Sequence, residues 1–301
     1  MGNRLQKAVE IMFRKQIILN VTDFKARKNR INLNWAPIVR KNKLGLVALS
    51  DSTKQNLGDY LANPIYEYML HKYNLDKDKK VKGTKHLYTI GSILLIGHQD
   101  ATVWGSGILM GEPEGLIWAR NRYRHLDVRC VRGPLTMKRL LENGIDVSNC
   151  KMGDPGVLMP LIYQPKAYKR KDFGILIHMS ERDNPSHKKE YDAYDSHIID
   201  IMTDDYQKTI DDIYSCDLII SSTLHGIILA ESYGIPAILL DRLEFDDFKY
   251  VDYYLGTGRK REDIPVAKSI QEALEMERPI VPDLKEAQNN LLSSFPVDLW
   301  M

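Results

Sequence analysis

The feature that most constrains the fold of this chain is the regular alternation of short apolar runs with segments of helical periodicity. Short apolar runs bounded by turn residues are typical of buried strands, and alternating strands and helices favour βα units around parallel sheets. The expected strands span residues 44–49, 92–96, 102–104, 115–119, 127–131, 173–179, 198–202, 218–221 and 237–240. The expected helices span residues 60–73, 134–143, 206–214 and 224–233.

This pattern predicts an α/β protein made of two Rossmann-like lobes, each built on a parallel sheet, with a cleft between them. A chain of 301 residues is long enough for two domains of about 150 residues each. Residues 163–172 contain Pro165, four basic residues and few apolar ones, which is the composition of a linker. We therefore expect lobes at 1–164 and 165–301, with the last helix packing back on the first lobe.

The composition excludes several classes of protein. The chain has 42 Lys and Arg against 40 Asp and Glu, a balance that gives no reason to expect nucleic acid as a partner. The cysteines Cys130, Cys150 and Cys216 have no paired spacing, so neither a disulfide framework nor a zinc site is predicted. No apolar run approaches the roughly 20 residues that span a bilayer. These features predict a cytoplasmic protein that does not cross the membrane by itself.

The first residues have the pattern of a basic amphipathic helix. Apolar side chains recur at helical spacing, with four basic residues beside them. The apolar positions are Leu5, Ala8, Val9, Met12 and Phe13. Two interpretations stay open: the apolar stripe packs on the protein's own core, or the helix lies on a membrane surface.

The second lobe has a candidate site where an expected strand ends and a helix begins, at Ser222, Thr223, Leu224, His225 and Gly226. Open α/β sheets bind ligands at such turns, because the backbone amides at a helix start favour anions. A histidine there can act as an acid or base near neutral pH. The alternative is an imidazole that only caps the helix or satisfies a buried carbonyl.

The first lobe offers two further turns. Asn56, Gly58 and Asp59 lie between an expected strand and a helix, where glycine lets the backbone approach a ligand and the polar side chains can cap the helix. A plain capped turn would have the same residues. Ser106 lies in a glycine-rich turn at 104–107 that lacks the spacing of a dinucleotide fingerprint or a P-loop. Neither NAD nor ATP binding is predicted.

Five arginines between residues 120 and 132 form the main basic concentration of the chain, and they include Arg129 and Arg132. Arg132 ends an expected strand and precedes Gly133-Pro134, so we expect its guanidinium at the carboxyl edge of the sheet. A guanidinium there suits a carboxylate or a phosphate, because it can donate two parallel hydrogen bonds. The alternative is a solvated basic face, which fits Arg132 less well than the arginines before it.

Six motifs, in their order along the chain, resemble those of the polysaccharide pyruvyltransferase family. They are NLGD at 56–59, WGSG at 104–107, VRGP at 131–134, GDP at 153–155, STLHG at 222–226 and GIP at 234–236. The resemblance extends from about residue 56 to about residue 254. The stretch FKYVDY at 248–253 is similar to one in the shorter members, which decorate bacterial exopolysaccharide repeat units.

The resemblance implies a GT-B-like pair of lobes, phosphoenolpyruvate as donor and a saccharide as acceptor. The product would be a pyruvate ketal, with phosphate released. It implies no required cofactor and no metal site, and leaves the use of a divalent ion open. His225, Arg132 and Lys249 occupy the positions of the family's functional residues, with the imidazole as proton carrier and the two cations holding the carboxylate and phosphate of the donor. The residues expected to contact donor or acceptor are Asn56, Gly58, Asp59, Ser106, Arg129, Ser222, Thr223, Leu224 and Gly226.

One departure from the family affects the donor site. Many members have arginine where this chain has Thr223, so a donor contact is missing or comes from another residue such as Arg129 or Arg242. Two other functions therefore stay open. One is a GT-B-like glycosyltransferase with a nucleotide-sugar donor, and the other is a carbohydrate-binding relative without activity.

A second departure is the stretch of about fifty residues before Asn56, which contains the amphipathic helix. Acceptors in such pathways are often lipid-linked sugars on the cytoplasmic leaflet. We therefore hypothesise peripheral membrane contact through residues 1–21 at the inner face of the membrane. Equal flotation with anionic liposomes of the full chain and of a chain lacking residues 1–21 would contradict this hypothesis.

Overall fold

The computed structural model describes residues 30–33, 35–40, 43–48, 56–82, 85–94, 100–109, 125–166, 170–178, 181, 184–241 and 247–301. The amphipathic helix expected near the N-terminus, the strand expected at 115–119, and Arg242 lie outside these ranges. Every helix within the described ranges is too short or too polar to span a bilayer.

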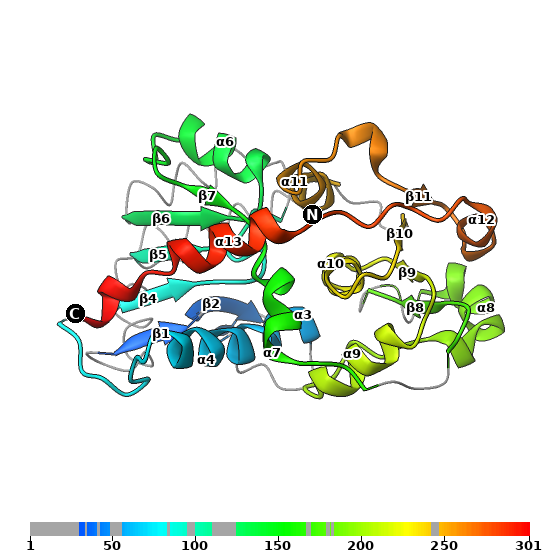
Figure 1. Ribbon diagram of the computed structural model, residues 1–301, viewed down its shortest axis with the longest axis horizontal. Helices are drawn as coiled ribbons and strands as arrows, with labels where there is room; N and C mark the ends of the chain where they lie inside the picture. The colour runs from blue at the N-terminus through cyan, green and yellow to red at the C-terminus, as the bar shows by residue number, and fades with distance from the viewer. Residues whose placement is uncertain are drawn as a thin grey trace.

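The first lobe is built on a five-stranded parallel sheet with the order β1-β4-β5-β6-β7 (Figure 1). Its strands are β1 (Ile31–Leu33), β4 (Lys85–Tyr88), β5 (Ala101–Trp104), β6 (Leu126–Val131) and β7 (Lys151–Met152). A separate antiparallel pair joins β2 (Trp35–Arg40) to β3 (Lys43–Ala48). The helical segments of this lobe are α3 (Leu57–Tyr60), α4 (Ala62–Lys72), α6 (Pro134–Glu142), the 3-10 helix η2 (Pro155–Leu158) and α7 (Met159–Ile162).

The second lobe is built on a four-stranded parallel sheet with the order β11-β10-β9-β8. Its strands are β8 (Gly174–Leu176), β9 (Ile219–Ser221), β10 (Ala237–Leu240) and β11 (Val266–Ala267). The α-helices are α8 (Pro185–Ala193), α9 (Tyr206–Tyr214), α10 (Leu224–Ser232) and α12 (Ile270–Glu275), and the 3-10 segments are η3 (Asp195–His197) and η4 (Arg261–Asp263). The structure is therefore α/β with two parallel-sheet lobes, which confirms the fold class expected from the sequence.

Several expected elements are present with small shifts of their ends. The strands at 102–104, 127–131, 218–221 and 237–240 correspond to β5, β6, β9 and β10. The helices at 134–143, 206–214 and 224–233 correspond to α6, α9 and α10. These segments combine an apolar run with clear turn residues at both ends, so both their type and their limits are encoded locally.

Two expected strands are wrong and one lies in a different sheet. The first of these is the strand expected at 92–96. The strand of this region is β4, which ends at Tyr88, and the chain turns at Gly91 (φ 104°), so residues 92–94 are not a strand. The segment 198–202 forms only an isolated bridge between Ile198 and Ile175, while the carbonyl of Ile201 accepts a hydrogen bond from the Leu57 amide of the first lobe. The strand expected at 44–49 is β3, which pairs antiparallel to β2 outside the main sheet.

One of the hydrophobic core clusters extends across both lobes. A single cluster of buried side chains joins Ile65 and Met69 of α4 to Ile228 and Leu229 of α10. Helix α10 also packs against η2 of the first lobe. The lobes therefore meet through buried apolar surface as well as around a site.

The chain returns to the first lobe near its C-terminus. Helix α13 (Lys285–Ser294) lies against β6 and β7, and the indole of Trp104 donates a 3.0 Å hydrogen bond to the carbonyl of Leu291. The last segment, η5 (Val297–Trp300), ends the chain on this lobe (Figure 1). Helix α11 (Phe248–Gly256) packs against α6, so it also belongs spatially to the first lobe.

A buried ion pair fixes α11 on the first lobe. The Nε of Arg132 lies 3.2 Å from Oδ2 of Asp252, and the two side chains are 1% and 0% exposed. The Asp252 carboxylate also accepts hydrogen bonds from the amides of Leu135 and Thr136 and from the Thr136 hydroxyl, so it caps α6. A Cβ on Gly133 would lie 1.9 Å from the Asp252 carbonyl oxygen, which explains the glycine in the Arg-Gly-Pro turn.

We predict that Asp252→Ala lowers the free energy of unfolding by about 3 to 5 kcal/mol, because it leaves a buried guanidinium without its counter-ion. Chemical denaturation measures this loss. The control is Asp192→Ala, which removes an exposed pair with Lys188 on α8 and should leave stability almost unchanged. Equal stability of the two variants would contradict the structural role assigned to Asp252.

Candidate active site

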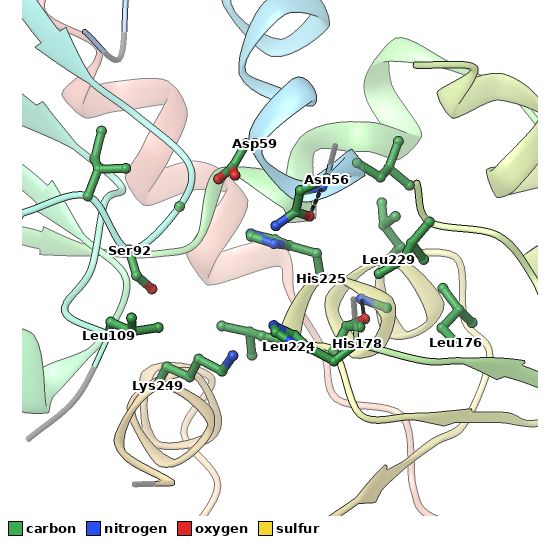
Figure 2. A pocket seen from close by; sticks show the side chains of 17 residues that line it. Asn56, Asp59, Ser92, Leu109, Leu176, His178, Leu224, His225, Leu229 and Lys249 are labelled. Atoms are coloured by element: carbon green, nitrogen blue, oxygen red, sulfur yellow. Dashed lines mark hydrogen bonds between the residues drawn. The ribbon is translucent and has the colours of Figure 1, made fainter. Parts of the chain in front are cut away.

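A cavity of about 190 Å³ lies at the carboxyl ends of the strands, where the two lobes meet. The lining residues come from the start of α3, the turn after β4, the end of β8, helix α10 and helix α11, together with Leu109 and Ile201 (Figure 2). The polar side chains that line the cavity are Asn56, Asp59, Ser92, His178, Thr223, His225 and Lys249. Its other lining residues are mainly apolar and include Leu57, Ile93, Leu109, Leu176, Ile201, Leu224 and Leu229.

His225 lies in the first turn of α10. The helix starts correctly because the Thr223 hydroxyl accepts a 3.0 Å hydrogen bond from the Gly226 amide. The Nε2 atom of His225 is buried and has no hydrogen-bond partner among the described residues. Burial, and then the charges of Arg132 and Lys249, lower the pKa of His225 to about 3. The imidazole is therefore neutral at pH 7, and a bound anion would pair with it and raise its affinity for a proton.

The first lobe approaches this imidazole closely through Gly58. A Cβ on Gly58 would lie 1.9 Å from Nδ1 of His225, so a side chain at this position would displace the ring. The turn is held by a 3.0 Å hydrogen bond from the Gly58 amide to Oδ1 of Asn56, and by the bond from the Leu57 amide to Ile201. The NLGD motif thus places the backbone of Gly58 in close contact with the imidazole of His225.

Lys249 enters the cavity from α11. No carboxylate of the described residues lies within 4.0 Å of its amine, which lies 4.8 Å from the centroid of the Tyr250 ring. Burial and then the charge of Arg132 lower the pKa of Lys249 to about 8, against the opposing effect of Asp59. Burial raises the pKa of Asp59 to about 6, and Lys249 lowers it. A largely buried ammonium without a close counter-ion makes the cavity attractive to an anion.

Arg132 does not line the cavity, which differs from the expectation that its guanidinium meets an anion there. Its donors are directed to Asp252, to the Ser92 hydroxyl at 2.8 Å and to the carbonyl of Ile108 at 2.5 Å. The guanidinium already has the Asp252 carboxylate as its counter-ion. Arg132 therefore lies outside the layer of residues that line the cavity. Its guanidinium donates a hydrogen bond to Ser92, which does line the cavity.

Two residues that were expected to contact the substrates, Ser106 and Ser222, also lie outside the lining of the cavity. The Ser106 hydroxyl donates a 2.8 Å hydrogen bond to the Gly91 carbonyl and so holds the turn that carries Ser92. The Ser222 hydroxyl accepts a 2.8 Å bond from the His178 amide, and the Ser222 carbonyl accepts one from the Tyr250 hydroxyl. Both serines fix the backbone around the cavity.

Arg129 is the expected residue that the structure places away from the site. It is 36% exposed and pairs with Asp127 and with Asp298 near the C-terminus. Its strand position points it to the outer region of the first lobe, so it does not replace the family arginine at Thr223. The remaining expected residues, Asn56, Gly58, Asp59, Thr223, Leu224 and Gly226, line the cavity together with His225 and Lys249.

Two polar residues that line the cavity, His178 and Ser92, were not predicted from the sequence. His178 follows β8 and lies at the carboxyl end of a parallel strand, which is the same signal that identified the turn before His225. Ser92 was not predicted as a site residue because its segment has the apolar pattern of a strand, whereas the chain turns at Gly91. Among the described residues, no group of three or more His, Cys, Asp or Glu side chains is placed to hold a metal ion.

The fold and the cavity define an α/β protein with a pocket between two parallel-sheet lobes, and a largely buried lysine and two histidines line this pocket. The family model for polysaccharide pyruvyl transferase matches residues 2–243, and the chain belongs to this family. The matched range includes the stretch before Asn56 that the sequence analysis treats as an added segment. It ends before Lys249, so α11 with its cation lies beyond the match.

Two individual proteins are similar to this chain, and both are described as uncharacterized. An uncharacterized protein of Acanthamoeba polyphaga mimivirus is 30% identical over 186 residues, which cover 59% of this chain and 62% of the relative. The match thus spans less than two thirds of that relative's length. The crystal structure of a functionally uncharacterized protein from Klebsiella pneumoniae is similar with a TM-score of 0.44 at 11% identity, over 79% of this chain and 91% of the other.

We predict that Lys249→Met makes the protein more stable at pH 7. The folded-state pKa of Lys249 lies below that of an unfolded lysine, so its charge destabilises the fold fully below about pH 8. This penalty declines as the pH rises from about 8 towards 10.5, the ordinary value of a lysine. The thermal unfolding midpoint should therefore rise by a few degrees at pH 7 and converge with wild type in alkali. Lys72→Met, at the exposed end of α4, is the control, and a lowered midpoint for Lys249→Met would contradict the account.

Proposed function

We propose that this protein transfers the enolpyruvyl group of phosphoenolpyruvate to two hydroxyls of a saccharide and so forms a pyruvate ketal. The observation that carries the proposal is a largely buried ammonium without a close counter-ion, beside a buried imidazole whose Nε2 has no partner among the described residues. Membership of the polysaccharide pyruvyl transferase family supports both the transferred group and the class of acceptor. The donor and the ketal linkage are the parts that the proposal adds.

The reaction needs two proton transfers. The first hydroxyl attacks C2 of the donor while C3 receives a proton and becomes a methyl group. The bond between C2 and the phosphate oxygen then breaks, and the second hydroxyl attacks C2. In the overall balance the two hydroxyls lose two protons, while C3 gains one proton and the released phosphate gains one. The donor already carries the activated group, so no resident cofactor is required.

His225 suits the proton transfer to C3. A neutral imidazole can accept the proton of the first hydroxyl, and the negative charge of the bound donor raises the affinity of the ring for that proton. The resulting imidazolium can then protonate C3. The position of Gly58 against the ring keeps the imidazole in one place during both transfers.

Lys249 suits the anionic groups of the donor, and Asn56 and Asp59 suit the hydroxyls of a sugar. Arg132 is assigned a positioning role, because it holds Ser92 and, through Asp252, the helix that carries Lys249. The apolar residues of the cavity fit the methylene group of the donor and keep water from the reacting carbon. Since the donor is a cytoplasmic metabolite, we propose that the reaction takes place in the cytoplasm, on a free saccharide or on a lipid-linked one at the inner face of the membrane.

We predict that His225→Asn lowers turnover by at least about 100-fold while the dissociation constant of phosphoenolpyruvate changes by less than about tenfold. Turnover is measured as phosphate released with phosphoenolpyruvate and a panel of methyl glycosides of common hexoses, and binding is measured by calorimetry. His71→Asn, at the exposed end of α4, is the control.

The same assays separate this proposal from the alternatives. A glycosyltransferase would release nucleoside diphosphate from a nucleotide sugar and would not bind phosphoenolpyruvate. A binding protein without activity would retain saccharide affinity and be indifferent to His225→Asn. Absence of phosphoenolpyruvate binding to the wild-type chain would overturn the proposal.

A further inference from the structure

The cavity contains a second imidazole, His178, which the mechanism above does not use. It lies at the end of β8, and its amide donates a 2.8 Å hydrogen bond to the Ser222 hydroxyl, so its backbone position is fixed. Burial, and then the charge of Lys249, lower the pKa of His178 to about 4. The charge of Lys249 therefore acts on the ring, which is neutral at pH 7.

The polar side chains divide the cavity into two sides. In Figure 2 the His178 ring lies on the same side as the Lys249 amine, while Asn56 and Asp59 lie on the opposite side and His225 lies between them. Glu181 is also close to His178, because its amide donates a 2.8 Å hydrogen bond to the His178 carbonyl, but its carboxylate pairs with His187 at 2.9 Å. The phosphate of a donor is therefore expected beside Lys249 and His178, because the Asp59 carboxylate repels it from the other side.

Ketal formation requires proton delivery to two different atoms of the donor, and His178 is placed to serve one of them. One proton must reach C3 and another must reach the oxygen that leaves with phosphate, and these two atoms lie on different sides of C2. A single imidazole that is held in place by Gly58 cannot face both atoms. His225 lies near the centre of the cavity and suits C3, whereas His178 lies on the phosphate side.

We propose that His178 contacts the phosphate group of the donor beside Lys249 and donates the proton that the departing phosphate takes. This inference rests on the proposed function. His178 takes up a proton when the donor binds and passes it to the bridging oxygen as the bond from C2 to that oxygen breaks. His225 accepts the proton of the second hydroxyl and loses it to solvent after the product leaves, so the two imidazoles end each cycle as they began it.

Calorimetry with three probes tests the contact. Inorganic phosphate, pyruvate and phosphoenolpyruvate are titrated at pH 7 into wild type, His178→Asn and the control His71→Asn, in two buffers of different ionisation enthalpy. His178→Asn should weaken inorganic phosphate and phosphoenolpyruvate by about tenfold or more and leave pyruvate within about twofold. The number of protons taken up with phosphoenolpyruvate should fall by about one relative to wild type. The control should behave like wild type.

The outcomes separate this inference from the proposed function. Unchanged phosphate affinity in His178→Asn overturns the contact, and weaker binding with the wild-type proton uptake overturns the proton transfer. Loss of pyruvate affinity to the same degree as phosphate affinity places His178 at the carboxylate instead and also overturns the assignment. If wild type binds inorganic phosphate but not phosphoenolpyruvate, the proposed function fails while the phosphate contact of His178 stands.

A measurement on the wild-type chain makes the test independent of how the variant folds. Nuclear magnetic resonance of the imidazole nitrogens follows the protonation of each histidine ring, and addition of inorganic phosphate at pH 7 should move the His178 signals towards the protonated form. A ring that stays neutral in the presence of saturating phosphate would overturn the proposal.

Discussion

The buried pair of Arg132 and Asp252 is the constraint on which the site depends. It joins the Arg-Gly-Pro turn of the first lobe to α11, a helix that lies between the second-lobe strands β10 and β11 in the chain, and the same carboxylate caps α6. Taking two charges out of water is costly, and the cost is offset only because nearly every donor and acceptor finds a partner. The result is that Lys249, one turn before Asp252, enters the cavity. The guanidinium of Arg132, which the sequence suggests as a contact of the donor, therefore positions the ammonium of Lys249.

The cavity itself combines titratable groups whose burial costs free energy. A largely buried ammonium, a carboxyl with a raised pKa and two imidazoles with lowered pKa values share one small space. Each of these shifts has burial as its largest cause, so the fold gives up stability to keep the groups in place. A bound anion relieves the conflict, because it pairs the ammonium and allows the imidazoles to take up protons. Clustering of such perturbed groups in a cavity is typical of functional sites.

Local sequence signals predicted the second lobe better than the first. Strand β10 and helix α9 have clear apolar patterns and turn residues at their ends, whereas the short strand β4 contains Lys85 and His86 and gives no such signal. Of the site, the turns around Gly58 and His225 could be found because both follow expected strands. The location of Lys249 in the same cavity followed only from the family resemblance. The pairing of Arg132 with Asp252 and the exclusion of Arg129 depend on contacts between residues more than 100 positions apart, which no local pattern encodes.

A crystal structure of the chain with phosphoenolpyruvate at neutral pH tests the central claim most directly, because it locates the anion relative to both lobes. The account predicts the phosphate within hydrogen-bond distance of Lys249, the C3 atom next to the His225 ring, and the Arg132–Asp252 pair intact. A donor bound directly to Arg132 after this pair has opened would contradict the account. A donor outside the cavity would do so as well, for example in the surface pocket at the opposite ends of β4 to β6 near Lys85 and His125.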